Sequence, residues 1–433
     1  MESGGVPLGE AFRFWLKLGF ISFGGPAGQI AIMHQELVER RRWISERRFL
    51  HALNYCMLLP GPEATQLATY IGWMMHRTWG GIVAGGLFVL PSLFILIALS
   101  YLYMAYGSVP AVAGLLYGIK PAVVAIVLAA AWRIGSRALK HPALWAISAA
   151  AFIAIYALDV PFPAIVVGAA LIGALGGRLA PRVFALGGHA SADKRYGPAL
   201  IDDDTPVPAH ARYRFSRVLF FFLAGLALWA AVLLALFLLF GWDGMLTRMG
   251  WFFTKAALLT FGGAYAVLPY VYQAAVEHYQ WLSATQMIDG LALGETTPGP
   301  LIMVVAFVGF VGGWQGGLSD SAFLAGAAGA TVATFFTFLP SFLVILVGGP
   351  LVESTHGDIK FTAPLTGITA AVVGVVVSLA VFFAEHVFFP RGIDWIAAAA
   401  SAVALVALMR YKAGLIPVIL ASGAAGMIYT LWR

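Results

Sequence analysis

Phe23-Gly24-Gly25 recurs in this chain as Phe261-Gly262-Gly263, and Pro60-Gly61-Pro62 recurs as Pro298-Gly299-Pro300. Both repeats lie 238 positions apart. Leu90-Pro91-Ser92 finds its match 249 positions later, a change that one short insertion explains. This spacing indicates an internal duplication. A duplicated membrane protein whose helices are interrupted by glycine and proline has the organisation of a secondary transporter, with the binding site expected at the interruptions.

The composition predicts an all-α polytopic membrane protein. Of the 433 residues, 61% are hydrophobic and 11% are charged, whereas soluble domains carry about 25% charged residues. Apolar runs such as 218–240 approach the ~20 residues that a membrane-spanning helix needs. A single cysteine, Cys56, excludes a disulfide framework or a multi-cysteine metal site. The sequence predicts no cofactor, and no soluble domain presents a basic face to nucleic acid.

Apolar segments and polar breaks divide the chain into four parts. We predict a first transmembrane repeat over 9–178, a cytoplasmic linker over 179–214, one connecting helix over 215–240 and a second repeat over 249–431. About thirteen apolar segments result. If each repeat returns the chain to the side where it began, the lone connecting helix turns the second repeat upside down. The expected fold is therefore two inverted-topology repeats.

The distribution of arginine supports this inversion. Five arginines lie in the loop at 33–48, whereas the matching loop at 271–285 has no Lys or Arg. The positive-inside bias places the first loop in the cytoplasm and the second outside. It also predicts that segments 49–75 and 285–312 re-enter, folded at their Pro-Gly-Pro turns. The charges leave open whether segment 12–33 and its counterpart span the membrane or re-enter.

The repeated glycines and prolines are the first candidates for substrate binding. Two prolines around a glycine cannot lie inside a regular helix, and adjacent glycines permit unusual backbone angles. Backbone N–H groups freed at the start of a half-helix attract anions. For the Gly-Gly pairs alone, close helix packing is the alternative interpretation.

Two carboxylates lie beside the Pro-Gly-Pro turns, Glu63 in the first half and Glu295 in the second. A carboxylate at membrane depth is costly and therefore functional by default. Either one is a candidate for proton coupling. A structural ion pair or an interfacial position is the alternative for both.

Lys17 and Lys255 are matched cations, each six positions before its Phe-Gly-Gly. A lysine can attract an oxyanion as a point charge, and the alternative is a side chain that snorkels to the interface. Lys120, before Pro121, is matched by Thr369. We expect Lys120 to be a lone cation near a helix end.

Several of these stretches resemble the signature of the chromate ion transporter family, in its long, two-domain form. They are Leu18-Gly19-Phe20-Ile21-Ser22-Phe23-Gly24-Gly25-Pro26, Glu39-Arg40-Arg41-Arg42-Trp43-Ile44-Ser45, Leu59-Pro60-Gly61-Pro62-Glu63-Ala64-Thr65-Gln66-Leu67 and Gly294-Glu295-Thr296-Thr297-Pro298-Gly299-Pro300. The resemblance implies export of chromate across the bacterial plasma membrane, driven by the proton motive force. It also implies antiparallel halves.

The combined hypothesis is a proton-coupled chromate exporter, and not an enzyme. Its partners are chromate or sulfate, protons and the lipid bilayer, and a homo-oligomer is compatible with the sequence. A transporter of sulfate or another oxyanion and a passive anion channel are the alternatives. The candidate substrate-binding residues are Lys17, Ser22, Phe23, Gly24, Gly25, Pro60, Gly61, Pro62, Gln66, Lys255, Phe261, Gly262, Gly263, Thr297, Pro298, Gly299 and Pro300.

Overall fold

The structure, a computed structural model, describes residues 6–23, 25–184, 196–206, 208–261, 263–354, 362–390 and 392–432. The described residues form helices, with no β-strand beyond an isolated bridge between Ile44 and Ile201. Among the described residues, seven helices are long and apolar enough to cross a membrane: α4, α5, α7, α9, α14, α15 and α17. An all-α polytopic membrane protein is thus confirmed. The thirteen apolar segments stay a prediction.

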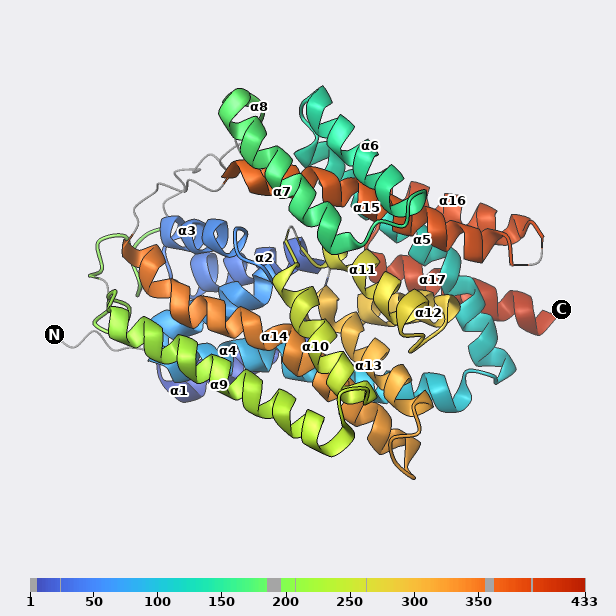
Figure 1. The fold of residues 1–433 in the computed structure, drawn as a ribbon, viewed down its shortest axis with the longest axis horizontal. Coiled ribbons are helices and arrows are strands. Elements are labelled where there is room, and N and C mark those ends of the chain that lie inside the picture. The colour runs from blue at the N-terminus through green and yellow to red at the C-terminus, as the bar shows by residue number, and fades with distance from the viewer. Residues whose placement is uncertain are drawn as a thin grey trace.

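The first half contains two broken helices followed by long ones (Figure 1). Its elements are α1 (Leu8–Ile21), α2 (Gly25–His34), η1 (Gln35–Arg40), α3 (Glu46–Cys56), α4 (Glu63–Tyr106), α5 (Pro110–Ala138), α6 (Pro142–Tyr156), α7 (Phe162–Leu179) and the short α8 (Pro181–Phe184). The connecting helix is α9 (Phe215–Phe240).

The second half repeats this order. Its elements are α10 (Met245–Leu258), α11 (Ala264–Tyr272), η2 (Gln273–His278), α12 (Ala284–Thr296), η3 (Leu301–Met303), α13 (Val304–Gln315), α14 (Ala322–Ser354), α15 (Thr362–Phe388), α16 (Trp395–Met409) and α17 (Leu415–Trp432). The half-helices α1 and α10 have 14 residues each, about 21 Å at 1.5 Å per residue. Neither can cross a membrane alone.

Helix α4 is two arms that meet at a sharp bend. His76 and Arg77 have non-helical backbone angles, and Arg77 has a φ of +56°. Gly72 on one arm packs against Gly80 on the other, because a Cβ on Gly72 would lie 2.4 Å from the Gly80 carbonyl oxygen. The first arm therefore ends near residue 75 and the chain turns back. The bend lies after segment 49–75, whose predicted fold is at Pro60-Gly61-Pro62 between α3 and α4. Re-entry of this segment into a membrane stays a prediction.

The first two broken segments start and finish at one end of the molecule. The Arg41 guanidinium lies 3.1 Å from the Glu10 carboxylate, which joins the end of η1 to the start of α1. The His76 ring lies 2.7 Å from the Val6 carbonyl oxygen, so the bend of α4 reaches the same place. Helices α1 and α2 thus form a hairpin that starts and finishes at one end of the molecule. Whether segment 12–33 spans a membrane or re-enters stays open.

The second half makes the equivalent contacts at residues 245–316. A Cβ on Gly312 would lie 2.5 Å from the Met249 side chain and 3.2 Å from that of Trp281. A Cβ on Gly316 would lie 2.3 Å from Met245. The start of α10, the loop after η2 and the end of α13 therefore meet. Both broken segments of this half also return to one end.

The two halves exchange helices. Gly118 of α5 packs on α17, where its Cβ would lie 2.8 Å from the Gly426 Cα atom. Gly367 of α15 packs on α7, where its Cβ would lie 2.9 Å from the Gly173 Cα atom. Figure 1 shows α6 and α7 beside α15, and α17 beside α5. Close approach of helix backbones at small residues is typical of packing in membranes.

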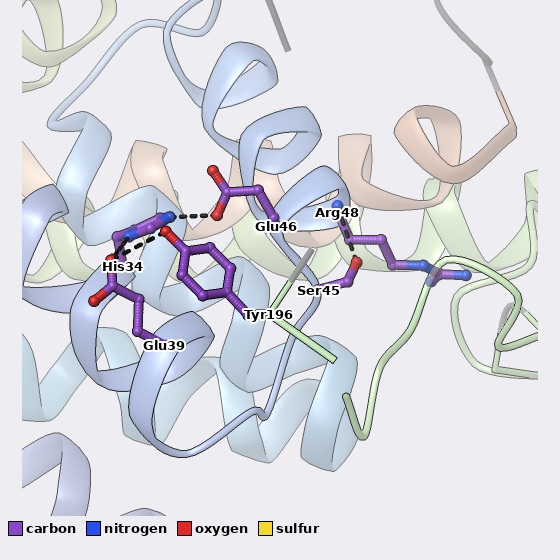
Figure 2. Close-up of polar contacts among 6 residues, drawn as sticks. All are labelled: His34, Glu39, Ser45, Glu46, Arg48 and Tyr196. Atoms are coloured by element: carbon purple, nitrogen blue, oxygen red, sulfur yellow. Dashed lines mark hydrogen bonds and ion pairs between the residues drawn. The ribbon is translucent and has the colours of Figure 1, made fainter. Parts of the chain in front are cut away.

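The described part of the linker docks onto the arginine-rich loop. The Leu200 N–H donates to the Arg42 carbonyl at 2.9 Å, and the Ser45 N–H donates to the Ile201 carbonyl at 2.9 Å. Figure 2 shows His34 between Glu39 and Glu46, with Tyr196 of the linker 3.4 Å from Glu39. The linker is therefore fixed to the first half at this end.

Candidate functional site

The two halves meet at their repeated motifs through two reciprocal hydrogen bonds. The Gly61 N–H donates to the Thr260 carbonyl at 2.7 Å, and the Gly299 N–H donates to the Ser22 carbonyl at 2.8 Å. Ser22 and Thr260 are themselves matched, each directly before its Phe-Gly-Gly. Each Pro-Gly-Pro turn is thus bonded to the broken helix of the opposite half. We call this place the meeting point.

Glycine is required in both turns. Gly61 has a φ of +119° and Gly299 a φ of +107°, a region that side chains disfavour. A Cβ on Gly61 would lie 2.3 Å from the Ser341 hydroxyl oxygen, and a Cβ on Gly299 would lie 2.7 Å from the Ser92 Cβ. Both serines belong to the repeated Leu-Pro-Ser motif. The long helices α4 and α14 therefore press a serine against the opposite turn.

Buried polar atoms without partners surround the meeting point. The hydroxyls of Ser22, Ser92 and Ser341 have no hydrogen-bond partner among the described residues, although all three residues are at most 1% exposed. The same holds for the side-chain oxygens of Gln29 and Gln66. An unsatisfied buried group costs about 1–3 kcal/mol. A bound polar ligand would satisfy these atoms.

The two glutamines are held in place by their amide nitrogens. Gln29 donates to the Gly299 carbonyl at 2.5 Å, and Gln66 donates to the Pro60 carbonyl at 2.7 Å. These bonds tie both side chains to the Pro-Gly-Pro turns. The free hydroxyls can donate to an anion, whereas the free amide oxygens can accept only from a protonated group or from water.

Four helices begin at the meeting point. Helices α2 and α11 start directly after the Phe-Gly-Gly motifs, and α4 and η3 start directly after the Pro-Gly-Pro turns. The first N–H groups of a helix lack intrahelical partners and carry a partial positive charge. Helices α1, α3, α10 and α12 end beside the same motifs, so carbonyl groups lie here as well. The amino-terminal N–H groups are the backbone donors that an anion would use.

The two predicted carboxylates lie at this level. Glu63 is the first residue of α4, where the helix dipole favours negative charge. Glu295 is buried near the end of α12 and accepts a hydrogen bond from the Tyr265 hydroxyl. Arg133 of α5 is close enough to interact electrostatically with Glu295. The second carboxylate thus has partners from both halves.

Other predicted residues lie around this arrangement. Gly25 has a φ of +68° and Gly263 a φ of +99°, so both motifs turn at a glycine. The Thr297 hydroxyl donates to the Leu293 carbonyl at 2.7 Å. Phe23 and Phe261 are half-buried beside the breaks, and Pro62, Pro298 and Pro300 are buried in the turns. Gly24 and Gly262 lie outside the described residues.

The matched lysines make no described contact with the Pro-Gly-Pro turns. Lys17 is exposed on α1, one turn after the exposed Arg13. Lys255 lies 5.9 Å from the centre of the Trp251 ring, in a cavity that also contains Arg248. Among the described contacts that converge on the Pro-Gly-Pro turns, neither lysine takes part.

The sequence analysis missed a buried ion pair. Asp289 of α12 is 2% exposed, accepts a hydrogen bond from Tyr103 at 2.9 Å and lies 3.7 Å from the Lys120 ammonium. The expectation that Lys120 is a lone cation near a helix end is therefore wrong. Lys120 lies inside α5, and its partner comes from the other half. A carboxylate in an apolar segment, the signal that selected Glu295, would also have selected Asp289.

Gln29, Ser92 and Ser341 were also missed as site residues. Ser92 and Ser341 belong to a recurring tripeptide, and that recurrence was the available signal. Gln29 has no repeated partner, because Val267 occupies the matched position. Only the hydrogen bond from Gln29 to the opposite turn identifies it.

Comparison with known proteins gives a consistent result. A family model described as chromate transporter matches residues 9–174 and 247–427. The chain is 32% identical to the chromate transport protein of Pseudomonas aeruginosa, covering 97% of this chain and 92% of that protein. It is 27% identical to the chromate transport protein of Cupriavidus metallidurans, covering 96% and 92%. It is also 27% identical to the probable chromate transport protein of Synechococcus elongatus, covering 85% and 82%. No solved structure matches the chain.

These relatives carry the names of transport proteins, which favours a transporter over a membrane-embedded enzyme. The family match extends over both halves and spans most of the chain. The described helices supply several apolar crossings. The chain therefore belongs to the chromate transporter family and is a multi-pass protein of the bacterial inner membrane.

Proposed function

We propose that this protein exports chromate from the cytoplasm, that its halves are inverted repeats, and that the dianion binds at the meeting point. The observation that carries the proposal is the pair of reciprocal hydrogen bonds from Gly61 to Thr260 and from Gly299 to Ser22. A site built equally by two inverted halves can be opened first to one side and then to the other by the same relative movement.

Chromate is a tetrahedral dianion, and the meeting point offers what such an ion needs. The free hydroxyls of Ser22, Ser92 and Ser341 are donors that approach from both halves. The amino-terminal ends of four helices add oriented N–H groups. Neutral donors hold a dianion without a strong ion pair, so the ion can also leave, as transport requires.

The lysines have a separate role in this proposal. A charged side chain at membrane depth faces a water-filled cavity rather than lipid. Lys17 and Arg13 share one exposed face of α1, so we assign this face to the cytoplasmic approach. Lys255, in its cavity near the other end, is assigned to the opposite approach. Both attract the anion toward the meeting point without binding it there.

Glu63 and Glu295 are assigned to proton coupling. Each carboxylate lies beside a Pro-Gly-Pro turn, where its negative charge opposes the binding of a dianion. A proton on the carboxylate removes that repulsion. Tyr265 and Arg133 stabilise the charged form of Glu295, whereas Glu63 relies on the start of α4. The two carboxylates are therefore not equivalent.

The test is chromate uptake into everted membrane vesicles, in which export from the cell appears as uptake. We expect uptake to depend on the proton gradient and to fall at least tenfold when Ser22, Ser92 and Ser341 are all replaced by alanine. Gly86→Ala is the matched control, because a Cβ there meets nothing within 4 Å. Normal uptake by the triple variant would overturn the assignment of the site.

The same assay separates the alternatives. Strong competition by sulfate would indicate a general transporter of tetrahedral dianions. Uptake that continues after the proton gradient is collapsed would indicate a passive anion channel. Replacing both Lys17 and Lys255 by alanine should slow uptake at low chromate concentration and leave the rate at saturation nearly unchanged. An unchanged rate at every concentration would remove the lysines from the proposal.

A further inference from the structure

Two cavities of similar size lie at opposite ends of the connecting helix α9. One, of about 550 Å³, is formed by residues before and at the start of α9, together with the bend of α4 and the end of α14. The other, of about 500 Å³, includes Trp242, directly after α9, and the start of α10. The first lies at the end of the molecule that carries the arginine-rich loop, which the positive-inside bias places in the cytoplasm. We call it the basic cavity.

The basic cavity is strongly positive. Arg77, Arg214 and Arg217 line it, and no Asp or Glu is among its described lining residues. Arg217 is held by the linker, because its guanidinium donates to the His210 carbonyl at 2.6 Å and to the Ala209 carbonyl at 3.3 Å. Arg77 projects from the bend of α4. Guanidinium groups from two segments, the bend of α4 and the start of α9, thus line a space that has no carboxylate among its described lining residues.

Most of the remaining wall of the basic cavity is apolar, with Thr78 and His210 as its polar members. Trp73, Phe221, Leu346 and Pro350 line it beside the arginines. Helix α9 is exposed along most of its length, with only 11% of its apolar window buried inside the protein. In a membrane protein such a helix borders lipid. The cavity therefore combines a cationic head at the cytoplasmic surface with an apolar wall that continues toward the acyl chains.

We propose that the basic cavity binds the phosphate group of an anionic phospholipid of the cytoplasmic leaflet, with the lipid's acyl chains along α9. Arginine matches a phosphate through several N–H donors, and basic pockets between helices at the cytoplasmic surface recognise anionic head groups. The volume falls within the usual range for small-molecule sites. The lipid would connect α9, the linker and the bend of α4, all of which line this cavity.

The second cavity provides an internal comparison. Its arginine, Arg248, lies 2.5 Å from the Asp243 carboxylate, so its charge is neutralised. The remaining lining consists of Lys255, Thr247 and four aromatic or imidazole side chains, those of Trp242, Trp251, His278 and Tyr279. A difference in lipid selectivity between the two ends of α9 should therefore follow charge rather than size.

The experiment measures lipid binding to the purified full-length protein in detergent, by native mass spectrometry. The probes are phosphatidylglycerol, phosphatidylcholine and inorganic phosphate. We expect phosphatidylglycerol to bind more tightly than phosphatidylcholine, and Arg77→Gln and Arg214→Gln each to weaken phosphatidylglycerol binding about fivefold. Arg248→Gln is the matched control and should leave this binding unchanged. Thermal unfolding without added lipid checks that each variant is folded.

Three outcomes would overturn the proposal. Equal binding of the two lipids would remove the selectivity for negative charge. Unchanged phosphatidylglycerol binding in folded Arg77→Gln and Arg214→Gln variants would place the lipid elsewhere. Displacement of phosphatidylglycerol by inorganic phosphate at similar concentrations would assign the cavity to a free oxyanion. Since Arg217 also holds the linker, the test rests on the other two arginines.

Discussion

Replacing Gly61 by alanine tests whether the tight turn at the meeting point is required for transport. The φ of Gly61 is +119°, and holding a non-glycine residue in such a region costs about 1–3 kcal/mol. The new Cβ would also lie 2.3 Å from the Ser341 hydroxyl oxygen. Overpacking of this kind costs a further ~1–3 kcal/mol. The expected total is about 2–6 kcal/mol, enough to depopulate the native turn by at least thirtyfold.

Two measurements, chromate uptake and thermal unfolding, test whether Gly61→Ala strains the turn. We expect Gly61→Ala to lower chromate uptake into everted vesicles by at least tenfold and to lower the midpoint of thermal unfolding in detergent. Adding Ser341→Ala removes the closest atom and leaves the Ser341 Cβ at 3.5 Å, an ordinary contact, with the Gln66 Nε2 atom still 2.8 Å from the new Cβ. The double variant should regain the part of the stability lost to Ser341, but not the part lost to Gln66 or the part that arises from φ.

The control is Gly86→Ala in the same helix α4, where a Cβ meets nothing within 4 Å. It should unfold at or slightly above the wild-type temperature, since alanine favours the helix. The reasoning would be refuted if Gly61→Ala unfolded and transported like the wild type. It would be refuted in part if the double variant were no more stable than Gly61→Ala, because the contact with Ser341 would then carry no strain.

Three further predictions concern polar groups. Asp289→Asn should lower the free energy of unfolding by about 3 kcal/mol, the low end of the range for a broken buried ion pair, because the Lys120 side chain is 24% exposed. The Asp289→Asn/Lys120→Gln double variant should regain most of this loss in thermal unfolding. An unaltered melting curve for the single variant would count against the pair. Ser92→Ala and Ser341→Ala should each raise the KM for chromate about tenfold without loss of thermal stability, because neither hydroxyl has a partner among the described residues. A lower stability with normal chromate uptake would make both serines structural residues. Burial lowers the pKa of His210 from its ordinary value of 6.5, so the unfolded chain binds the proton more readily and stability is lost as the pH falls below about 6.5. When the free energy of unfolding is measured between about pH 8 and pH 5, its dependence on pH should therefore be weaker in His210→Gln than in the wild type. An equal dependence on pH would contradict this.

The repeats and the charges predicted how the broken helices run. Adjacent prolines and glycines cannot continue a helix, so the breaks at residues 22–24 and 60–62 follow from local chemistry. The arginines at 40–48 predicted a return of segment 49–75 at its Pro-Gly-Pro turn, and the structure breaks the helix there, between α3 and α4. The topology of the two halves relative to a membrane stays a proposal.

The candidate site was only partly predictable. Gly61 and Gly299 were selected because they belong to repeated motifs, and Ser22 because it lies in a stretch that resembles the family signature. The structure brings them together. Ser92, Ser341 and Gln29 were missed, since a serine or glutamine in an apolar helix has no local mark of function. Lys17 and Lys255 were selected by recurrence, although recurrence does not say which face of a helix a side chain occupies.

The sequence by itself determined the class of protein, the duplication and the positions where helices break, because hydropathy, glycine and proline act within a few residues. Only the tertiary structure decided which broken helix meets which turn. The bonds from Gly61 to Thr260 and from Gly299 to Ser22 join residues about 200 and 277 positions apart, across the two halves. Such pairings depend on how whole helices pack, as does the pairing of Lys120 with Asp289. Local composition does not encode that packing, because the same apolar helix can present any of its faces to a neighbour.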